Sequence, residues 1–507
     1  MIDFAAMTEG LRLLFGSWSP WLVMVPGLAV GLIFGAVPGL TTSMAMVICL
    51  PLTLYMDFLS AIIFLTSIFT GGGFGCAIPA ILVNIPGMPG AVATTFDGYP
   101  MAQRGEHNEA LGLGLMASTF AEALSYVILL LLVVPIAAFV LKLSSPEMLI
   151  VGLWGLTLIA ALRGRHYTRG LLAGILGLLL GTIGFSARGD IRGTMGIDYL
   201  LDGIPEIPAM MGLFCAAELF KLMRLDYVVE RAEARRVSLR RILAGARDTF
   251  RYPRLLLRGS LIGAFIGAVP GVGSSVANLL AYSEARRTAP DKERFGKGDP
   301  RGVVAAEAAN SSSEGGSMAT LLALGIPGGG ATAIMLGAFA MHNITGGPRF
   351  IAENKPIVYA IIFSNLVQSI ALMGIGILFI YLAGAIVKTP VRVLVPSIFA
   401  VSIFGCYAIT GNIAGPVTFL VFTLIGWQMQ RYDYPVAATV VGLLLAHLVE
   451  GEALRTYQLS GGDPAYLLER PIALVLLALL VLSLVWPLIA RRFGLGFGRQ
   501  SAADTGD

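Results

Sequence analysis

Long apolar runs without a single charge are the feature that most constrains the fold of this chain. The clearest are Tyr126–Leu141, Ile357–Val387 and Ile472–Ala490. A helix of about 20 apolar residues crosses the hydrocarbon core of a bilayer. Only 13% of the 507 residues are charged, against about 25% in an ordinary soluble domain. We therefore expect an all-α polytopic protein of the lipid bilayer with roughly 11–14 membrane segments, since a β-barrel would show short alternating segments.

A repeated motif divides the chain into two halves. The stretch GAVPG occurs at Gly35–Gly39 and again at Gly267–Gly271, each time inside a longer matching pattern. Each copy is followed by an Ile-Pro-Gly, which ends at Gly87 in the first half and at Gly328 in the second. The sequence therefore predicts a duplicated chain with four Pro-Gly breaks, two in each half.

The distribution of basic residues indicates how the halves are oriented. Lys and Arg collect on the cytoplasmic side, and the densest basic segment is Lys221–Arg258. Few charges hold the N-terminus in the cytoplasm, so we expect it to be periplasmic and the C-terminus cytoplasmic. The halves would then be inverted repeats, as in many secondary transporters; parallel repeats are the alternative. The predicted division is a first repeat at 1–220, a basic cytoplasmic connection at 221–258, a second repeat at 259–490 and a polar cytoplasmic tail at 491–507.

The four breaks predict discontinuous helices or re-entrant hairpins. Proline removes a backbone donor, and glycine permits conformations that other residues resist. In lipid, non-helical backbone survives only where protein covers it or water reaches it. Freed carbonyl groups can hold a cation, and helix N-termini can hold an anion. The alternative is that these glycines serve helix packing alone.

Hydroxyl and amide side chains beside the breaks supply oxygen atoms suited to Na⁺ or to a carboxylate. The residues predicted to bind substrate are Gly39, Asn84, Pro86, Gly87, Thr94, Thr95, Gly271, Ser274, Ser275, Asn310, Pro327, Gly328 and Thr332. A co-transported Na⁺ is expected near Thr41, Ser43, Ser275, Asn310 and Ser311. H⁺ is the alternative coupling ion, and no cofactor is expected.

The polar segment Ala305–Ser317, AAEAANSSSEGGS, lies in a half that should be embedded in the membrane. A charge at the bilayer centre costs at least about 2.5–3.5 kcal/mol. We therefore expect either a solvated loop or a polar hairpin that lines the transport cavity.

Enzyme signatures are absent from the sequence. It contains no HExxH, no GxSxG and no Walker A run, so neither hydrolysis nor ATP drive is expected. The four cysteines form no CxxC pair, and the N-terminus lacks the features of a cleaved signal peptide. The basic segment lacks interleaved aromatic residues, so no nucleic-acid partner is expected.

The motifs closely resemble the TctA family, the large membrane subunits of tripartite tricarboxylate transporters. The most specific stretches are GAVPGLTTSMAMVICLPLT, NIPGMPGAVATTFDGYPMAQRG, FGKGDPRGVVAAEAANSSSEGG and LLALGIPGGGATAIMLGAF. The resemblance implies an ion-driven importer of organic acids in a bacterial inner membrane. It implies two partners, a small TctB-like membrane subunit and a periplasmic TctC-like solute-binding protein. An elevator-like movement of the polar core is expected, with rocking as the alternative. A passive channel or an exporter for small anions is the competing function.

Overall fold

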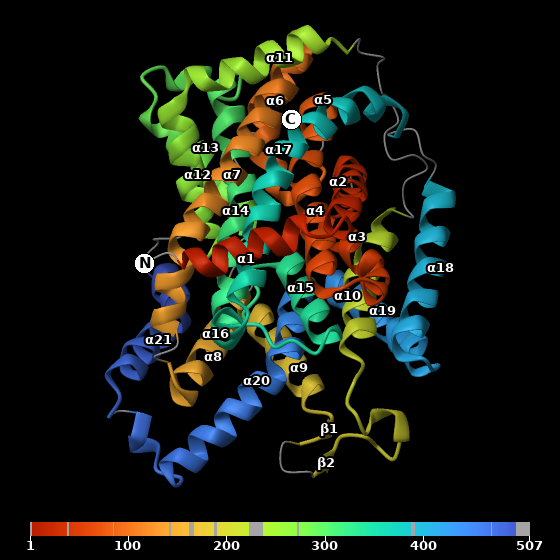
Figure 1. The fold of residues 1–507 in the computed structure, drawn as a ribbon, viewed down its shortest axis with the longest axis vertical. Helices are drawn as coiled ribbons and strands as arrows, with labels where there is room; N and C mark the ends of the chain where they lie inside the picture. Colours follow the sequence, from red (N-terminus) through yellow and green to blue (C-terminus); the bar gives the residue numbers. More distant parts are fainter. Residues whose placement is uncertain are drawn as a thin grey trace. The chain divides into compact units, whose positions relative to one another are not determined.

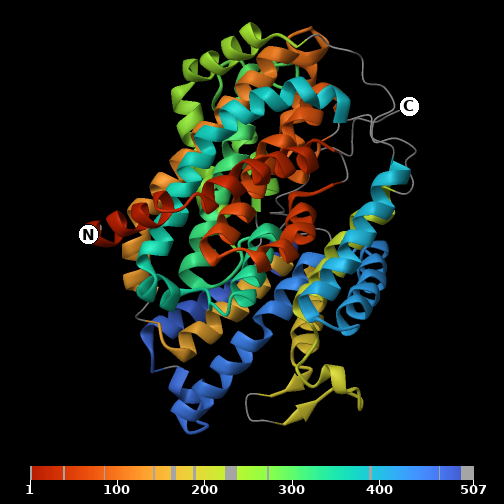
Figure 2. The same cartoon turned by 45° about the vertical axis from the view of Figure 1, so that its right-hand side comes forward.

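The computed structural model describes residues 3–37, 40–84, 86–140, 143–161, 167–186, 190–222, 237–270, 273–386, 391–467 and 469–492. These residues form helices joined by short loops, with one two-stranded ribbon (Figures 1 and 2). The all-α class predicted from the sequence is confirmed. The chain divides into two compact units: Met1–Lys142 with Pro205–Gln428, and Leu143–Ile204 with Met429–Asp507.

The first unit contains all four predicted breaks. Its first half is built from α1 (Phe4–Phe15), α2 (Ser19–Ala36), α3 (Thr42–Cys49), η1 (Leu50–Tyr55), α4 (Phe58–Gly75), α5 (Ala77–Val83), η2 (Pro89–Ala91), α6 (Val92–Gln103) and α7 (His107–Val140). Its second half is built from α10 (Glu206–Leu222), α11 (Leu239–Asp248), η4 (Thr249–Arg251), α12 (Pro253–Gly267), α13 (Gly273–Thr288), η5 (Lys292–Arg294), α14 (Pro300–Leu324), α15 (Gly330–Met341), α16 (Pro348–Glu353), α17 (Lys355–Ile386), α18 (Val391–Thr410) and most of α19 (Ala414–Arg431).

The second unit also takes segments from both halves of the sequence. It consists of α8 (Ser145–Ala161), α9 (Tyr167–Gly181), β1 (Gly184–Phe185), β2 (Ile191–Arg192), η3 (Asp198–Leu200), α20 (Val436–Ser460), η6 (Pro464–Leu467) and α21 (Pro471–Arg492). Helix α20 packs on α8 and α9, and α21 packs on α8. An ion pair of 2.8 Å between Arg192 and Glu450 joins the antiparallel ribbon (yellow in Figure 2) to α20. The division into sequence repeats predicted above stays a prediction.

Two series of helices in the first unit match in order and in contacts. Helix α2 packs on α4 as α12 packs on α14, and α3 packs on α4 as α13 packs on α14 (Figure 1). Each series also packs crosswise on the other: α1 and α4 contact α17, while α11 and α14 contact α7. The orientation of the two series in a membrane stays a prediction.

Glycines at four-residue spacing explain the closest of these contacts. A Cβ atom added at Gly27 would lie 2.7 Å from Ser67 Cβ, and one added at Gly35 would lie 2.8 Å from the Gly72 carbonyl oxygen. The matching Gly267 would place a Cβ 2.6 Å from Ser313 Cα. Real Cβ atoms do not approach so closely, so these glycines let the helix backbones touch. These glycines therefore serve helix packing, which is the alternative function considered above for the glycines near the breaks.

The same contacts show that the described segments on either side of the first break of each half form a hairpin. Contacts advance together along α2 and α4, so the two helices run in the same direction. The Ser19 hydroxyl, at the start of α2, lies 2.8 Å from that of Ser60 at the start of α4. Because α2 and α4 begin side by side, the segment between them runs back along α2 from its end to the level of its start. Helices α12 and α13 form the matching hairpin, in which Arg258 donates to Thr288 at 3.1 Å.

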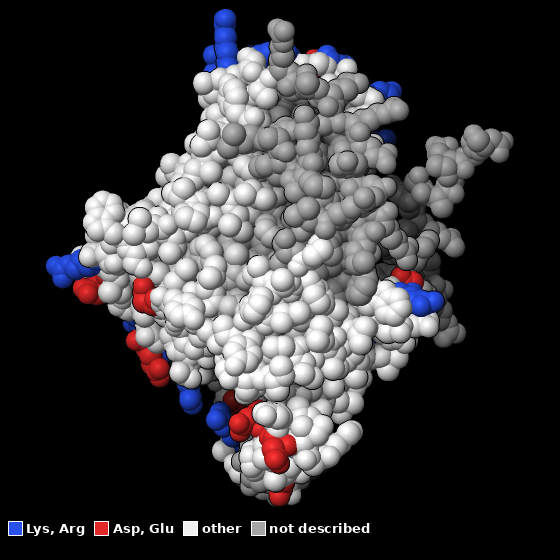
Figure 3. Space-filling view, turned by 90° about the vertical axis from the view of Figure 1, so that its right-hand side faces the viewer, with Lys and Arg blue, Asp and Glu red and all other residues white. Residues whose placement is uncertain are grey.

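Within the described residues, four helical segments are long and apolar enough to cross a membrane: Ser19–Ala36, Phe58–Leu82, His107–Pro135 and Lys355–Tyr381. Several shorter apolar helices accompany them, including α15 and the continuous segment Thr42–Tyr55, which consists of α3 and η1. Large apolar side chains such as Leu22 and Leu131 are exposed. Figure 3 shows a face on which charged side chains are sparse. The chain is a multi-pass membrane protein; its number of crossings stays a prediction.

The polar segment Ala305–Ser317 is neither a solvated loop nor a hairpin, so both interpretations of it were wrong. It forms the middle of α14, and every residue in it is buried. Alanines, serines and glycines dominate the segment, so neighbouring helices approach it on all sides. Its two glutamates and its asparagine find polar partners inside the protein, which removes the cost of exposing them to lipid.

Candidate functional site

The two breaks of the first half lie against each other. Gly87 donates its N–H to the Cys76 carbonyl oxygen at 3.2 Å. A Cβ atom at Gly87 would overlap the carbonyl oxygen of Gly35, three residues before Pro38. Beside this contact, Met88 Sδ accepts the Thr42 hydroxyl at 2.9 Å. The loop between α5 and α6 therefore closes over the tip of the α2–α3 hairpin.

The second half repeats this arrangement with different side chains. A Cβ atom at Gly328 would lie 2.8 Å from Ser317 Cα, and the Ser317 hydroxyl donates to the Gly267 carbonyl oxygen at 3.1 Å. Ser317 thus takes the place that Cys76 has in the first half. Asn84 and Gly325, which begin the two later breaks, both have positive φ, 60° and 69°. The two halves end their helices in the same left-handed conformation.

Contacts between the two halves connect the four breaks into a closed ring, in which each break contacts two others; we call this arrangement the ring. A Cβ atom at Gly90 would lie 2.6 Å from Ser274 Oγ and would overlap Asn310 Oδ1, and Asn278 donates its amide to the Gly90 carbonyl oxygen. On the matching side, a Cβ atom at Gly330 would lie 2.9 Å from Ser43 Oγ. Each hairpin tip therefore contacts the later break of the other half.

Four helices begin at this ring: α3, α6, α13 and α15. The first turn of a helix has N–H groups without intrahelical partners and carries a partial positive charge. Such N-termini bind carboxylates and phosphates. No Lys or Arg lies among the described residues of the four breaks. The ring can therefore attract an anion through backbone dipoles and hydroxyl groups.

Unsatisfied oxygen atoms also lie at the ring. Asn278 Oδ1 and Ser311 Oγ are buried and have no hydrogen-bond partner within the described residues. Asn310 donates its amide to the Gly73 carbonyl oxygen at 2.7 Å, which leaves Asn310 Oδ1 facing Gly90. Hydroxyl and amide oxygens of this kind are hard ligands that suit a small cation.

The structure places the predicted residues in different surroundings. Five of them lie at the ring: Gly87, Ser274, Asn310, Gly328 and Ser43. Ser275 lies in the first turn of α13, and Ser311 follows Asn310 on α14. Others satisfy their own backbone: Thr41 caps α3, Thr95 donates to Val92, and Thr332 bonds with Gly329. Asn84 is exposed, and Pro86 and Pro327 lie beside the break glycines. Gly39 and Gly271 lie outside the described residues.

Thr94 points to a residue that the sequence prediction missed. Its hydroxyl donates to Glu307, which also accepts from Ser118 at 3.2 Å. Asn278 and Gly90 were missed as well. Spacing could have found Glu307 and Asn278: Glu307, Asn310 and Glu314 recur at helical intervals, and Asn278 follows Ser274 by one turn. Because Ala305–Ser317 was predicted to be a loop or a hairpin, the prediction did not recognise that Glu307, Asn310 and Glu314 share one face of a helix.

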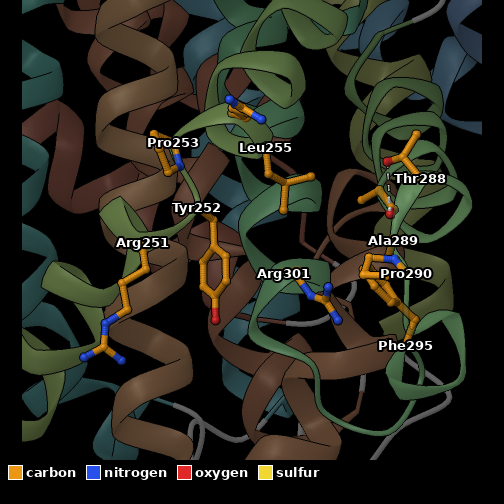
Figure 4. A pocket seen from close by; sticks show the side chains of 11 residues that line it. Arg251, Tyr252, Pro253, Leu255, Thr288, Ala289, Pro290, Phe295 and Arg301 are labelled. Atoms are coloured by element: carbon orange, nitrogen blue, oxygen red, sulfur yellow. Dashed lines mark hydrogen bonds between the residues drawn. The ribbon is translucent and has the colours of Figure 1, made fainter.

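A cavity of about 470 Å³ lies away from the ring, near the start of α12 and the end of α13 (Figure 4). Arg251, Arg254 and Arg301 line it, and none of the predicted site residues does. Arg301 is already paired, 2.6 Å from Asp299 and 2.7 Å from Asp291. Its hydrogen bond lowers the pKa of Asp291. This cavity is therefore a separate feature.

Comparison with known proteins indicates the same family as the sequence motifs. The family model described as the tripartite tricarboxylate transporter TctA family matches residues 21–441. An uncharacterized 52.8 kDa protein in the TAR-I ttuC' 3' region of Agrobacterium vitis is 30% identical over 456 residues, which cover 89% of this chain and 90% of the relative. An uncharacterized protein in the TAR-II ttuC' 3' region of the same organism is 30% identical over 227 residues, 45% of this chain and 94% of the relative. No solved structure matches the chain.

Proposed function

Because the chain belongs to the tripartite tricarboxylate transporter TctA family, we propose that it is the large permease subunit of a secondary transporter that imports organic di- and tricarboxylates across the bacterial inner membrane. The family is one of transporter components and not of enzymes. Uptake would be driven by a cation gradient, with Na⁺ favoured over H⁺.

The closed ring of four breaks is the observation that carries this proposal. Its hairpin tips lie beside Gly72 and Ser313, within buried helices and away from the helix starts at Phe58 and Pro300. Irregular backbone at such a depth is typical of transporter sites, where half-helix N-termini face anionic groups of the substrate. The four helix N-termini at the ring supply this anion-binding chemistry in both halves.

A substrate carboxylate would bind the N–H groups at the start of α15 or after Gly87. The hydroxyl groups of Ser274 and Ser275 would assist, in place of an arginine clamp. A Na⁺ ion would bind oxygen atoms near Asn310 and Ser311, where Ser311 Oγ has no partner in the described part of the chain. The bound cation would offset the negative charge of the substrate, which couples the two affinities.

Two partners would complete the transporter. A periplasmic TctC-like protein would capture the dilute acid and deliver it, and a small TctB-like membrane subunit would join the permease. The unit that holds the four breaks would carry the substrate by an elevator-like movement. The division of the chain into two compact units supports a moving part and a scaffold.

Uptake by proteoliposomes tests the proposal. The chain is reconstituted with its small membrane subunit and the binding protein, and entry of a labelled tricarboxylate is followed under an imposed Na⁺ or H⁺ gradient. Uphill uptake that needs the binding protein supports the proposal. Passage of the tricarboxylate down its own concentration gradient, without a cation gradient or a partner, would instead identify a passive channel.

A further inference from the structure

A second buried polar cluster lies where four helices of the first unit meet. Thr70 Oγ1 on α4 lies 2.6 Å from Glu122 Oε1 on α7 and 3.0 Å from Glu314 Oε1 on α14. It also lies 3.4 Å from Gln368 Oε1 on α17, and the Tyr126 hydroxyl donates to Glu314 at 3.1 Å. All five side chains are at most 3% exposed. We call these five residues the Thr70 cluster.

The hydrogen atoms in the Thr70 cluster are too few for its oxygen atoms. A threonine hydroxyl has one hydrogen, and ionised carboxylates only accept. Three acceptor oxygens surround Thr70 Oγ1, so its hydrogen serves only one of them. Gln368 donates one N–H to the Thr66 hydroxyl at 3.0 Å, and its oxygen faces Thr70. At least one further hydrogen, such as that of a protonated carboxyl group, is therefore needed to join Thr70 Oγ1 to a second acceptor.

A buried unpartnered oxygen atom on Glu122 gives a second reason to expect a proton on this pair of carboxyl groups. Glu122 Oε2 is fully enclosed and has no partner at hydrogen-bond distance within the described residues; the nearby Ser369 hydroxyl on α17 donates to the Asn365 carbonyl oxygen of its own helix at 2.8 Å. Tyr126 is the titratable side chain next to the two carboxyl groups. Among the described residues, no Lys, Arg or His interacts electrostatically with the carboxyl group of Glu122 or of Glu314. Two carboxyl groups that share a buried site do not both stay ionised, because removing a charge from water is expensive.

The distances favour a proton over a metal ion. Oxygen ligands of Ca²⁺ lie about 2.3–2.6 Å from the ion, and Na⁺ is of similar size. Ligands arranged around such an ion are spaced more widely than the 2.6 Å and 3.0 Å seen here. Separations of 2.5–3.0 Å between oxygen atoms are those of O–H···O hydrogen bonds.

We propose that Glu122 and Glu314 form a proton-binding centre, in which one exchangeable proton is held by the pair and is taken up from water with the substrate. The centre is separate from the ring of four breaks, where the Na⁺ is expected. The role in uptake rests on the proposed function; the binding of a proton does not. Glu122 and Gln368 lie in the middle part of the two long helices, as residue 16 of α7 and residue 14 of α17.

Infrared difference spectroscopy tests proton binding directly on the purified full chain. The carboxylic-acid C=O band is followed from about pH 5 to about pH 9, a window that brackets documented buried carboxyl groups. We expect a protonated carboxyl in the wild type that is lost in Glu122→Gln/Glu314→Gln. The control is Glu109→Gln, which removes a partly exposed carboxylate, paired with Arg241, from the same helix α7. A wild type without this band, or a double variant whose band is as strong as that of the wild type, overturns the proposal.

Uptake in proteoliposomes tests the coupling role. Coupling between bound ligands typically changes affinity about 5-fold to 150-fold, so we expect acidification outside to raise wild-type uptake within this range. Glu314→Gln should abolish the response to pH while the response to Na⁺ remains. If infrared data show the proton but Glu314→Gln keeps the wild-type pH response, the coupling role is wrong. Failure of uptake in the wild type would count against the proposed function alone.

Discussion

Gly87 packs directly on the carbonyl oxygen of Gly35, so that no side-chain atom fits between the second break and the first hairpin tip. We predict that Gly87→Ala destabilises the protein by about 1–3 kcal/mol, the usual cost of overpacking. Gly374→Ala on α17 is the control, because a Cβ atom there meets nothing within 4 Å. The thermal unfolding midpoint in detergent measures both. Equal midpoints for the two variants would show that the break loop does not close on the hairpin.

Loss of a hydroxyl at the ring should weaken transport without unfolding the protein. Ser274 Oγ faces Gly90 across the contact between the halves. We predict that Ser274→Ala raises the KM for the carboxylate about tenfold or more, because a hydrogen bond to a charged group contributes about 1.5–3 kcal/mol. Ser260→Ala on α12 is matched, since that hydroxyl bonds only its own helix at Leu256. A normal KM in Ser274→Ala would place the substrate elsewhere.

Asp97 should hold the loop between α13 and α14. Its Oδ1 accepts the N–H groups of Gly296, Gly298 and Asp299, each at 2.8 Å, and its Oδ2 accepts the Tyr282 hydroxyl at 2.9 Å. Removing this acceptor leaves buried donors unpaired, at about 1–3 kcal/mol each.

We therefore predict that Asp97→Ala makes the loop sensitive to trypsin, which cleaves after its lysines and arginines. Asp291→Ala, at a more exposed carboxylate of the same loop, should change cleavage much less. Identical digestion of wild type and Asp97→Ala would refute the anchoring role.

The class of fold and the positions of the four breaks could be predicted from the sequence alone. Apolar runs and repeated Pro-Gly pairs are local signals, and the structure places Gly87, Ser274, Asn310 and Gly328 together. The role of α14 was not predictable by the same reasoning. A charged, serine-rich segment is typical of a loop, and only contacts with distant helices make it a buried helix. Glu307 depends on Thr94 and Ser118, which are remote in sequence.

Opposite topology of the two halves gives a labelling prediction. In a cysteine-free background, a cysteine at the exposed Thr8 should react with an impermeant reagent from the periplasm, and one at Arg254 should react only after permeabilisation. The basic segment before α12 is the reason, because Lys and Arg collect in the cytoplasm. Labelling of both positions from the same side would mean that the repeats are parallel.

Binding of the substrate at the ring of four breaks is tested most directly by uptake in the reconstituted three-component system. The variants are Gly328→Leu, Ser275→Ala and Asn310→Ala, each first checked for a wild-type melting temperature. We predict that the folded variants lose most carboxylate uptake and that Asn310→Ala also loses its dependence on Na⁺. If every folded variant keeps wild-type uptake and wild-type Na⁺ dependence, the four breaks serve packing alone and the substrate path lies elsewhere.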